Sequence, residues 1–515
     1  MPTKGFYQYA SKDPEAPCLV FGDEVRSRGE TLDRIYRAAN GLRSLNLTKG
    51  DHLCLILKNR PEFIELIAAS GISGTLVTAV NWHLSADEVA YVVDDCDSSV
   101  VFVDVENAAV GMEAVKRASG EKTVISVGGE IDGATGFEQW LEIQDASPPH
   151  DEVAGGQMLY SSGTTGLPKG VERLPYSEDP DTNFEIGDQL RAMFPSPEEG
   201  VWLLTGPLYH AAPYGYTMAA FHHGSKVVIT DQFDADETLD LIEEHRIDSL
   251  HVVPTMFHRM LALPESRRKS FDPSSLVMAL HGAAPCPKET KAAMIDWWGP
   301  VIWEYYGATE GGLTLVSSQE WLERPGTVGK SLPFWEVIVL DEGGKEMGSG
   351  QTGTICFKSL LGRTFEYYKD PDKTTKAHPA PMVFTLGDIG MIDEDGYVFL
   401  TDRASDVIIT GGVNVYPAEV EGCLQGHPAV ADVAVIGVPH QEWGEEVKAI
   451  VQLEEGTEPS DELAHELIEF ARSRIARFKC PRSIDFEAVL PRTDTGKLYK
   501  RRLRERYWAD AGRAI

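Results

Sequence analysis

Residues 156–170, GQMLYSSGTTGLPKG, place a strand-like run directly before a loop of hydroxyl residues and glycines that ends in a lysine. Glycines let the backbone approach a ligand, and the hydroxyls and amides of such a turn can surround phosphate oxygens. The loop is not a Walker A motif, because Pro168 precedes Lys169 and Gly170 follows it. A flexible surface loop of the same composition is the alternative. The pattern predicts a phosphate-binding loop with the candidate residues Ser161, Ser162, Gly163, Thr164, Thr165 and Lys169.

Helix-like and strand-like segments alternate on both sides of this loop. Residues 30–130 show the alternation first, and residues 201–305 repeat it without repeating the sequence. Short apolar runs between segments of helical period are typical of βαβ units with parallel strands. We therefore expect an α/β fold with two such sheets.

Two further regions follow. Residues 325–400 contain short strand-like runs separated by turn residues, with no helical pattern, which predicts a hairpin-rich β subdomain. From Asp402 onward the pattern changes to α+β over a length sufficient for a small domain. We predict a large N-terminal domain at 1–401 and a small C-terminal domain at 402–515.

The composition excludes several classes of protein. The net charge of −33 repels nucleic acid, so no nucleic-acid partner is expected. The seven cysteines show no CxxC spacing, and neither a secretory signal nor a membrane span is recognisable. These features indicate a soluble cytoplasmic protein, and assembly as a homodimer stays open.

Four more segments follow the loop in order. They are Gly282-Ala283-Ala284-Pro285, Tyr305-Tyr306-Gly307-Ala308-Thr309-Glu310-Gly311, Thr385-Leu386-Gly387-Asp388-Ile389-Gly390 and Pro491-Arg492-Thr493-Asp494-Thr495-Gly496-Lys497. Each alone also fits a strand-ending turn, a buried tyrosine or a solvated lysine. In this order they resemble the motifs of the adenylate-forming superfamily, which includes acyl- and aryl-CoA synthetases, luciferases and peptide-synthetase adenylation domains. The resemblance spans roughly residues 30–505.

The resemblance implies a role for each matching residue. A tyrosine of the pair Tyr305-Tyr306 stacks on adenine, beside a pocket lined by the backbone at 282–284. Thr309 contacts phosphate, and Glu310 holds Mg²⁺, which prefers carboxylate oxygens. Asp388 accepts hydrogen bonds from the ribose hydroxyls, and Arg403 reaches ribose or phosphate. The implied site residues are Gly282, Ala283, Ala284, Tyr305, Tyr306, Gly307, Thr309, Glu310, Asp388 and Arg403, with Thr165, Glu310, His210 and Lys497 as the catalytic set.

The resemblance also implies a two-step reaction and a moving domain. ATP activates a carboxylate as an acyl-adenylate with release of pyrophosphate, and a thiol then displaces AMP. Lys497 enters the site for the first step, and the segment around Gly411-Gly412 enters it for the second. The C-terminal domain acts as a mobile lid that rotates about a hinge near Asp402 between the two steps. Coenzyme A is expected as the thiol, because glycines give its pantetheine arm room. Residues 470–515 hold 13 Lys plus Arg against 5 Asp plus Glu, a local positive charge that suits this polyanion.

The acid itself is less defined. His210, in a segment similar to the family's histidine-containing stretch, is the candidate for contact with the carboxylate. Tyr216, Trp303 and the pair His222-His223 suggest a wide aromatic pocket for a hydrophobic acid. After Gly170 two prolines and an acidic loop replace the helix start of many fatty acyl-CoA synthetases, so bulky steroid side-chain and aryl acids are candidates beside long-chain fatty acids. Two alternatives remain: loading of a carrier-protein phosphopantetheine, and a nucleotide-binding relative without catalysis.

Overall fold

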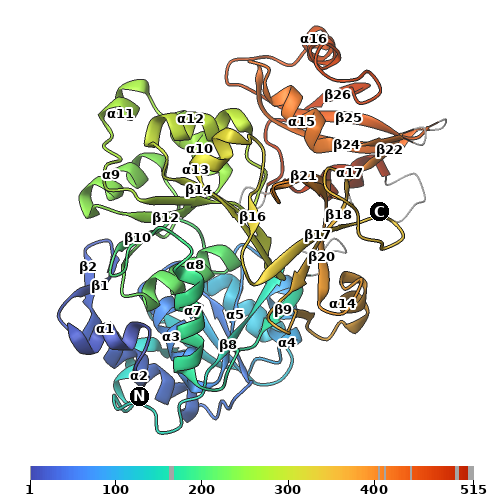
Figure 1. The fold of residues 1–515 in the computed structure, drawn as a ribbon. Helices are drawn as coiled ribbons and strands as arrows, with labels where there is room; N and C mark the ends of the chain where they lie inside the picture. The colour runs from blue at the N-terminus through green and yellow to red at the C-terminus, as the bar shows by residue number, and fades with distance from the viewer. Residues whose placement is uncertain are drawn as a thin grey trace.

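The computed structural model describes residues 2–161, 168–403, 406–410, 413–440, 443–492 and 498–508. Two large sheets with helices on their faces form most of the molecule, and two smaller sheets lie toward the C-terminal end (Figure 1). This is the mixed α/β architecture expected from the alternating segments.

The phosphate-loop candidate belongs to an eight-stranded sheet of order β19-β9-β8-β4-β3-β5-β6-β7. Neighbours from β8 to β7 are parallel, whereas β9 runs antiparallel to β8 and β19 antiparallel to β9. The strands are β3 (His52–Ile56), β4 (Leu76–Ala79), β5 (Val100–Asp104), β6 (Thr123–Val127), β7 (Thr135–Gly136), β8 (Gly156–Ser161), β9 (Lys169–Arg173) and β19 (Glu366–Tyr367).

Both faces of this sheet are covered by helices, which explains its continuous apolar strands. In β3, Leu53 and Leu55 join the core between the two large sheets, whereas Cys54 and Ile56 join an outer core with α4 and α5. Capping boxes at Ser27 and Ser85 fix the starts of α2 and α4. The helices are α2 (Arg28–Ser44), α3 (Pro61–Ser73), α4 (Ala86–Asp95), η1 (Val105–Asn107), α5 (Ala108–Arg117) and α6 (Phe137–Glu142).

The second large sheet has nine strands in the order β16-β15-β14-β13-β12-β10-β11-β1-β2. Its strands are β1 (Pro17–Phe21), β2 (Glu24–Ser27), β10 (Val201–Leu204), β11 (Lys226–Ile229), β12 (Ser249–Val252), β13 (Met278–His281), β14 (Ile302–Ala308), β15 (Gly311–Val316) and β16 (Lys330–Ser331). Strand β1 pairs in parallel with β11, so the N-terminal segment completes a sheet built mainly from residues after 200. The sequence pattern before residue 30 did not predict these two strands.

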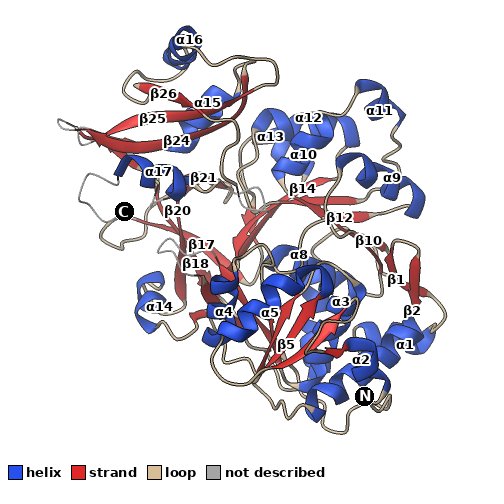
Figure 2. Cartoon of the chain, turned by 180° about the vertical axis from the view of Figure 1, so that it is seen from behind, coloured by secondary structure: helices blue, strands red, loops and turns tan. Residues whose placement is uncertain are grey.

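Helices cover the nine-stranded sheet on both faces as well (Figure 2). Residues of α8 share the core between the large sheets with β10 and β13, whereas α9, α10 and α12 contribute to the outer core. The helices of this region are α1 (Phe6–Lys12), α7 (Pro180–Arg191), α8 (Ala211–His222), α9 (Ala235–His245), α10 (Pro254–Leu261), α11 (Glu265–Ser270), α12 (Lys288–Trp298) and α13 (Ser318–Glu323).

The region 325–400 forms the predicted antiparallel sheet, with one correction. Its order is β17-β18-β20-β21, from β17 (Trp335–Leu340), β18 (Gly353–Ser359), β20 (Val383–Ile392) and β21 (Val398–Arg403). The expectation that no helix lies here is wrong, because α14 (Pro371–Ala377) follows the N-cap residue Asp370, whose side chain accepts a hydrogen bond from the amide of Lys373. Seven residues are too few for the helical period to show in the sequence.

The C-terminal region is α+β, as expected. Its strands are β22 (Ile408–Thr410), β23 (Val413–Val415), β24 (Val430–His440), β25 (Gly444–Leu453) and β26 (Ser483–Phe486), and its helices are α15 (Pro417–Gln425), α16 (Asp461–Arg472) and α17 (Lys500–Trp508). The proposed boundary at residue 402 falls inside β21, whose Asp402 pairs with Ile389 of β20. Within the described residues, no helix is both long and apolar enough to cross a membrane.

Candidate active site

The strands β8 and β9 bring the two ends of the phosphate-loop candidate together. Ser161 is the last residue of β8 and pairs with Lys169, the first residue of β9. The candidates Ser162, Gly163, Thr164 and Thr165 lie outside the described residues. The antiparallel register nevertheless fixes where the loop leaves and re-enters the sheet.

Lys169 faces a tyrosine that the sequence did not single out. Its Nζ lies 5.3 Å from the centre of the Tyr367 ring, and the Tyr367 hydroxyl donates a hydrogen bond of 2.8 Å to Oε1 of Glu310. Partial burial and the charge of Lys373 lower the pKa of Lys169. The phosphate-loop lysine and the predicted magnesium ligand are thus linked through Tyr367. The strand β19, which carries Tyr367, pairs with β9 and places it there.

The strands β14 and β15 hold the YYGATEG segment over this point. The register shifts between Gly307 and Ala308, so the chain bulges at the residues that precede Glu310. Arg173, at the end of β9, donates from Nε to the carbonyl of Thr309 at 2.9 Å and from a terminal nitrogen to that of Ala308 at 3.3 Å. Arg173 therefore ties the segment to β9. It lies on the same face of β9 as Lys169, because side chains alternate along a strand.

The two adjacent tyrosines point to different surroundings. The hydroxyl of Tyr306 donates a hydrogen bond of 2.7 Å to Oδ2 of Asp388, which lies on β20 and is 6% exposed. This contact joins the predicted adenine and ribose residues, although they are 82 positions apart. Tyr306 is therefore the member of the pair that can face a nucleotide next to Asp388.

Tyr305 is buried against the turn after β13. A Cβ added to Gly282 would come within 2.5 Å of its ring, so only glycine fits at that position. Ala283 has a φ of 67°, in the left-handed region that non-glycine residues rarely adopt. Such backbone strain is frequent where a chain turns beneath a ligand. Ala284 follows, half-buried.

A cluster of aromatic rings continues from Tyr305 to His210. The hydroxyl of Tyr305 lies 3.1 Å from Nε2 of His251, and the ring of Tyr216 stacks on His251 with centroids 5.8 Å apart. Burial, with the nearby His210, lowers the pKa of His251 to about 3, so this ring is neutral. His210 is the N-cap residue of α8, with its ring centroid 4.4 Å from that of Tyr209. His210 and Tyr216 thus belong to one aromatic cluster.

The pair His222-His223 does not belong to this cluster, which corrects the expectation that it widens the same pocket. The two residues lie at the opposite end of α8 from His210, roughly 18 Å away at the helical rise per residue. The ring of His222 contacts Phe184 at a centroid distance of 4.5 Å, and His223 faces Asp188 at 3.2 Å. Both contacts are to α7, so the pair joins two helices.

The remaining candidates belong to the C-terminal part of the chain. Arg403 ends β21 and is the backbone partner of Asp388 in β20, so its Cα lies beside the predicted ribose contact. Gly411, Gly412 and Lys497 lie outside the described residues. Their roles stay predictions.

Comparisons with known proteins place this site in a family. Residues 6–367 match the family model described as AMP-binding enzyme, and residues 419–497 match that of the AMP-binding enzyme C-terminal domain. The chain belongs to the family of AMP-binding enzymes, which confirms the adenylate-forming resemblance and the α/β fold class. It is an enzyme of the acid–thiol ligase class.

Individual relatives share nearly the whole chain. A fatty acid–[acyl-carrier-protein] ligase ScoC of Streptomyces coeruleorubidus is 32% identical over 98% of this chain and 96% of its own. A medium/long-chain-fatty-acid–CoA ligase FadD8 of Mycobacterium tuberculosis is 32% identical over 97% and 89%. Among solved structures, ATP-bound MatB from Rhodopseudomonas palustris is 27% identical with a TM-score of 0.85 and full coverage of both chains.

Proposed function

We propose that this enzyme activates a hydrophobic carboxylic acid with ATP and transfers the acyl group to coenzyme A. One observation carries the proposal: the contacts Lys169–Tyr367–Glu310 and Tyr306–Asp388 bring three separate motifs to one place. The aromatic cluster of His210, Tyr216 and Tyr305 adjoins them. Long-chain fatty, steroid side-chain and aryl acids all fit an apolar aromatic wall.

The first step joins the acid to the nucleotide. An oxygen of the carboxylate attacks the α-phosphorus of ATP, and the bond between that phosphorus and the pyrophosphate oxygen breaks. Lys169 and the loop at 161–165 hold phosphate oxygens, and Lys497 from the C-terminal region adds a cation as charge develops. Oε1 of Glu310 accepts the Tyr367 hydrogen bond, whereas Oε2 makes no hydrogen bond within the described residues and can ligate Mg²⁺. A bound Mg²⁺ would neutralise charge on the phosphates.

The second step replaces AMP by a thiol. The thiolate sulfur attacks the acyl carbon, and the bond from that carbon to the phosphate oxygen of AMP breaks. Gly411 and Gly412 would let the pantetheine arm pass once a lid at 402–515 has rotated. The relatives' names include both coenzyme A and carrier-protein acceptors, so the acceptor must be tested directly.

The test is AMP and pyrophosphate formation with a panel of acids. Straight-chain fatty, aryl and steroid side-chain acids are each supplied with ATP and Mg²⁺, and then with coenzyme A or with a carrier protein that bears phosphopantetheine. We expect pyrophosphate with at least one hydrophobic acid and AMP release that coenzyme A accelerates without a carrier. AMP release only with the carrier protein would favour an enzyme that loads a carrier-protein phosphopantetheine. Absence of pyrophosphate with every acid would favour a nucleotide-binding relative without catalysis.

Glu310→Gln tests the site itself. Removing its charge should lower the rate of pyrophosphate release by about 10²–10³-fold, because a preorganised charge near the reacting phosphates is lost. Glu323→Gln is the matched control, since Glu323 is 73% exposed and contacts only Arg324 among the described charged residues. Equal rates for the wild type and Glu310→Gln would refute the assigned role.

A further inference from the structure

The end of α4 contacts both sides of the sheet region that carries the phosphate loop. The hydroxyl of Tyr160 in β8 donates a hydrogen bond of 2.6 Å to Oδ2 of Asp95, the last residue of α4. Two residues further on, Asp97 accepts a hydrogen bond of 3.3 Å from the hydroxyl of Tyr368, which follows β19. Burial is the main cause that raises the pKa of both tyrosines, so each hydroxyl keeps the proton that it donates. Two tyrosines thus tie this sheet to one helix end.

Gly170 occupies the space between the two tyrosines. It pairs with Tyr160 across β8 and β9, and its carbonyl accepts a hydrogen bond of 2.8 Å from the amide of Tyr368. A Cβ added to Gly170 would lie 3.3 Å from the ring of Tyr160, 3.3 Å from Cβ of Tyr368 and 2.8 Å from the sulfur of Met158. Glycine at this position therefore lets the two tyrosine side chains lie on either side of β9.

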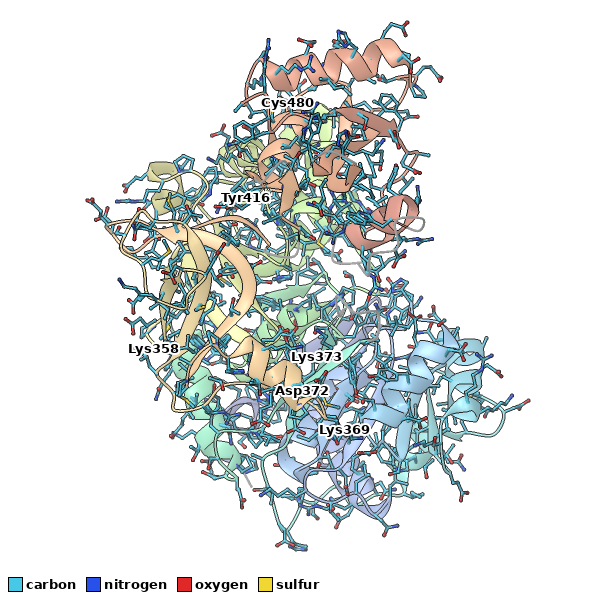
Figure 3. The ribbon with its side chains drawn as sticks, turned by 90° about the vertical axis from the view of Figure 1, so that its right-hand side faces the viewer. Lys358, Lys369, Asp372, Lys373, Tyr416 and Cys480 are labelled. Atoms are coloured by element: carbon cyan, nitrogen blue, oxygen red, sulfur yellow. The ribbon has the colours of Figure 1, made fainter. Side chains whose placement is uncertain are left out.

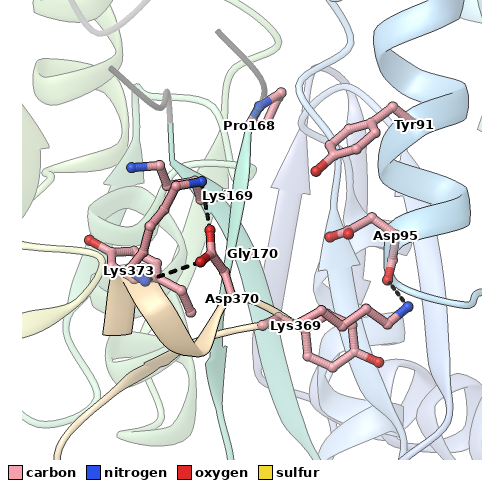
Figure 4. A pocket seen from close by; sticks show the side chains of 10 residues that line it. Tyr91, Asp95, Pro168, Lys169, Gly170, Lys369, Asp370 and Lys373 are labelled. Atoms are coloured by element: carbon pink, nitrogen blue, oxygen red, sulfur yellow. Dashed lines mark hydrogen bonds and ion pairs between the residues drawn. The ribbon is translucent and has the colours of Figure 1, made fainter. Parts of the chain in front are cut away.

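Lys369 joins the same helix end, at the place where α14 meets the N-terminal part of the molecule (Figure 3). Its Nζ donates a hydrogen bond of 2.7 Å to the backbone carbonyl of Asp95 (Figure 4). The same Nζ pairs with Oδ2 of Asp97 at 2.7 Å, and this contact lowers the pKa of Asp97. Cys96, between the two aspartates, has its sulfur 3.3 Å from that of Cys54 in β3. The helix end is therefore held on the sheet from both sides.

Asp97 and Lys369 both have a strained backbone. Their φ angles are 53° and 54°, in the left-handed region that non-glycine residues rarely adopt. Their side chains are 67% and 45% exposed, so the ion pair between them contributes little stability against this strain. Backbone strain of this kind is concentrated at functional sites. The stability of the fold therefore does not explain why a lysine stands at position 369.

These contacts define the α4 anchor, which consists of Asp95, Asp97, Tyr160, Tyr368 and Lys369. Each strand end that the anchor holds is next to a residue of the candidate site. Tyr160 directly precedes Ser161, and Tyr368 directly follows Tyr367. Tyr367 in turn contacts both Lys169 and Glu310. The anchor thus acts on the site through its neighbours in the chain, without itself belonging to it.

We propose that Asp95 and Lys369 are positioning residues for adenylation, which hold the two ends of the phosphate loop and Tyr367 in the arrangement that the reaction requires. The inference rests on the proposed function, because adenylation is the reaction in which the arrangement is used. A displacement of about 1 Å at a reacting group can lower a rate by about 10²-fold, so the spacing of these strands matters.

Lys369→Gly separates positioning from stability. Glycine relieves the left-handed backbone and removes both contacts to α4, so the unfolding temperature should not fall. In contrast, kcat for pyrophosphate release should fall by up to about 10²-fold. Arg246→Gly is the matched control, since Arg246 is the exposed C-cap residue of α9 and has a φ of 52°. It should relieve the same kind of strain and leave kcat unchanged.

A second pair of variants tests the contact to β8. Asp95→Ala removes the acceptor of the Tyr160 hydroxyl, whereas Asp95→Asn keeps an amide oxygen in its place. We expect kcat to fall in Asp95→Ala and to recover most of its wild-type value in Asp95→Asn, because the contact needs an acceptor and not a charge.

Nucleotide binding gives a readout that needs no acid. Calorimetry with the full-length protein measures the affinity for ATP with Mg²⁺ and the affinity for AMP. Lys369→Gly and Asp95→Ala should weaken ATP binding and leave AMP binding unchanged, because ATP has three phosphates to be aligned and AMP has one. Unchanged AMP affinity also shows that the variants fold.

Wild-type kcat in both Lys369→Gly and Asp95→Ala would overturn the proposal. Parallel loss of ATP and AMP affinity with a lower unfolding temperature would overturn it too, because the two residues would then support only the fold. Failure of the wild-type enzyme to release pyrophosphate with every acid would refute the proposed function instead. The comparison of ATP affinity with AMP affinity would still test the α4 anchor.

Discussion

Two clusters of buried charged side chains lie in the N-terminal part of the chain, and they differ in how many partners each charge has. In the arginine–glutamate network, defined as Arg26, Arg34, Arg60, Glu62 and Glu65, each carboxylate contacts at least two arginines. In the Lys291–Glu304 pair, Nζ of Lys291 contacts Oε2 of Glu304 at 2.6 Å.

In the Lys291–Glu304 pair, no second charged side chain contacts Glu304 among the described residues. His281 lies 3.7 Å from Glu304, but burial and the charge of Lys291 keep its pKa well below the usual value, so it is neutral. The buried carboxylates of the network are therefore neutralised by several arginines, whereas Glu304 is neutralised by one lysine. Glu304 lies on β14, two residues before Tyr306, and Lys291 lies on α12. The network instead joins β2 to α2 and α3.

The largest effect is expected for Lys291→Met. It leaves Glu304 buried without a cation, which should lower the free energy of unfolding by about 3–5 kcal/mol and raise the KM for ATP, because β14 positions Tyr306. Urea unfolding and pyrophosphate release measure the two effects. The double variant with Glu304→Leu should recover most of the stability, and a double variant as unstable as the single one would show that the charge is not the cause.

A smaller effect, with a defined pH range, is expected in the network. Burial alone would raise the pKa of Glu62, but Arg26 and Arg60 overcome this and lower it from 4.5 to about 2. The stabilisation is therefore complete above pH 4.5 and is lost as the pH falls toward 2, by about 3 kcal/mol in total.

Glu62→Gln should reduce the change of the unfolding temperature with pH between about pH 2 and pH 4.5. Glu265→Gln, at an exposed carboxylate of α11, is the control and should leave that slope unchanged. If Glu62→Gln retains the wild-type slope, the network does not carry the pH dependence.

The smallest effect is expected where neither charge is buried. Lys269 and Glu265 pair at 2.6 Å along α11, but their side chains are 75% and 71% exposed. Lys269→Ala should change the free energy of unfolding by less than about 0.5 kcal/mol, since solvent screens such pairs. If Lys269→Ala lowered the free energy of unfolding as much as Lys291→Met, burial would not explain why the two pairs differ.

Much of the fold could be predicted because its signals are local. The helix at Pro61–Ser73 and most of the parallel strands of both large sheets follow from apolar period and turn residues. The missed elements have a weaker signal: α14 is short, and β1, which pairs locally only with β2, finds its parallel partner β11 about two hundred residues later. Pairing over that distance is set by packing and leaves no period in the sequence.

Motifs in the sequence indicate part of the candidate site, and packing in the fold adds residues that no motif indicates. Glu310, Asp388 and Lys169 were recognised from their neighbours in sequence. Tyr367 and Arg173 contact the same segment, but only the sheet brings β19 and β9 beside it. Arg173 had one readable signal, since it shares the face of Lys169 along β9.

The pairing of β1 with β11 also bears on the order in which the chain folds. Strands β3 to β9 come from residues 52–173 and make up the eight-stranded sheet except for β19. Most of this sheet can therefore form while the chain is still being synthesised from its N-terminal end. Residues 17–27 emerge earlier and can form the hairpin of β1 and β2 by themselves, but the other edge of β1 must wait for Lys226–Ile229. Until then one edge of the apolar strand Pro17–Phe21 stays unpaired, and such an edge is the kind of segment that chaperones shield and that misassembles when synthesis stalls.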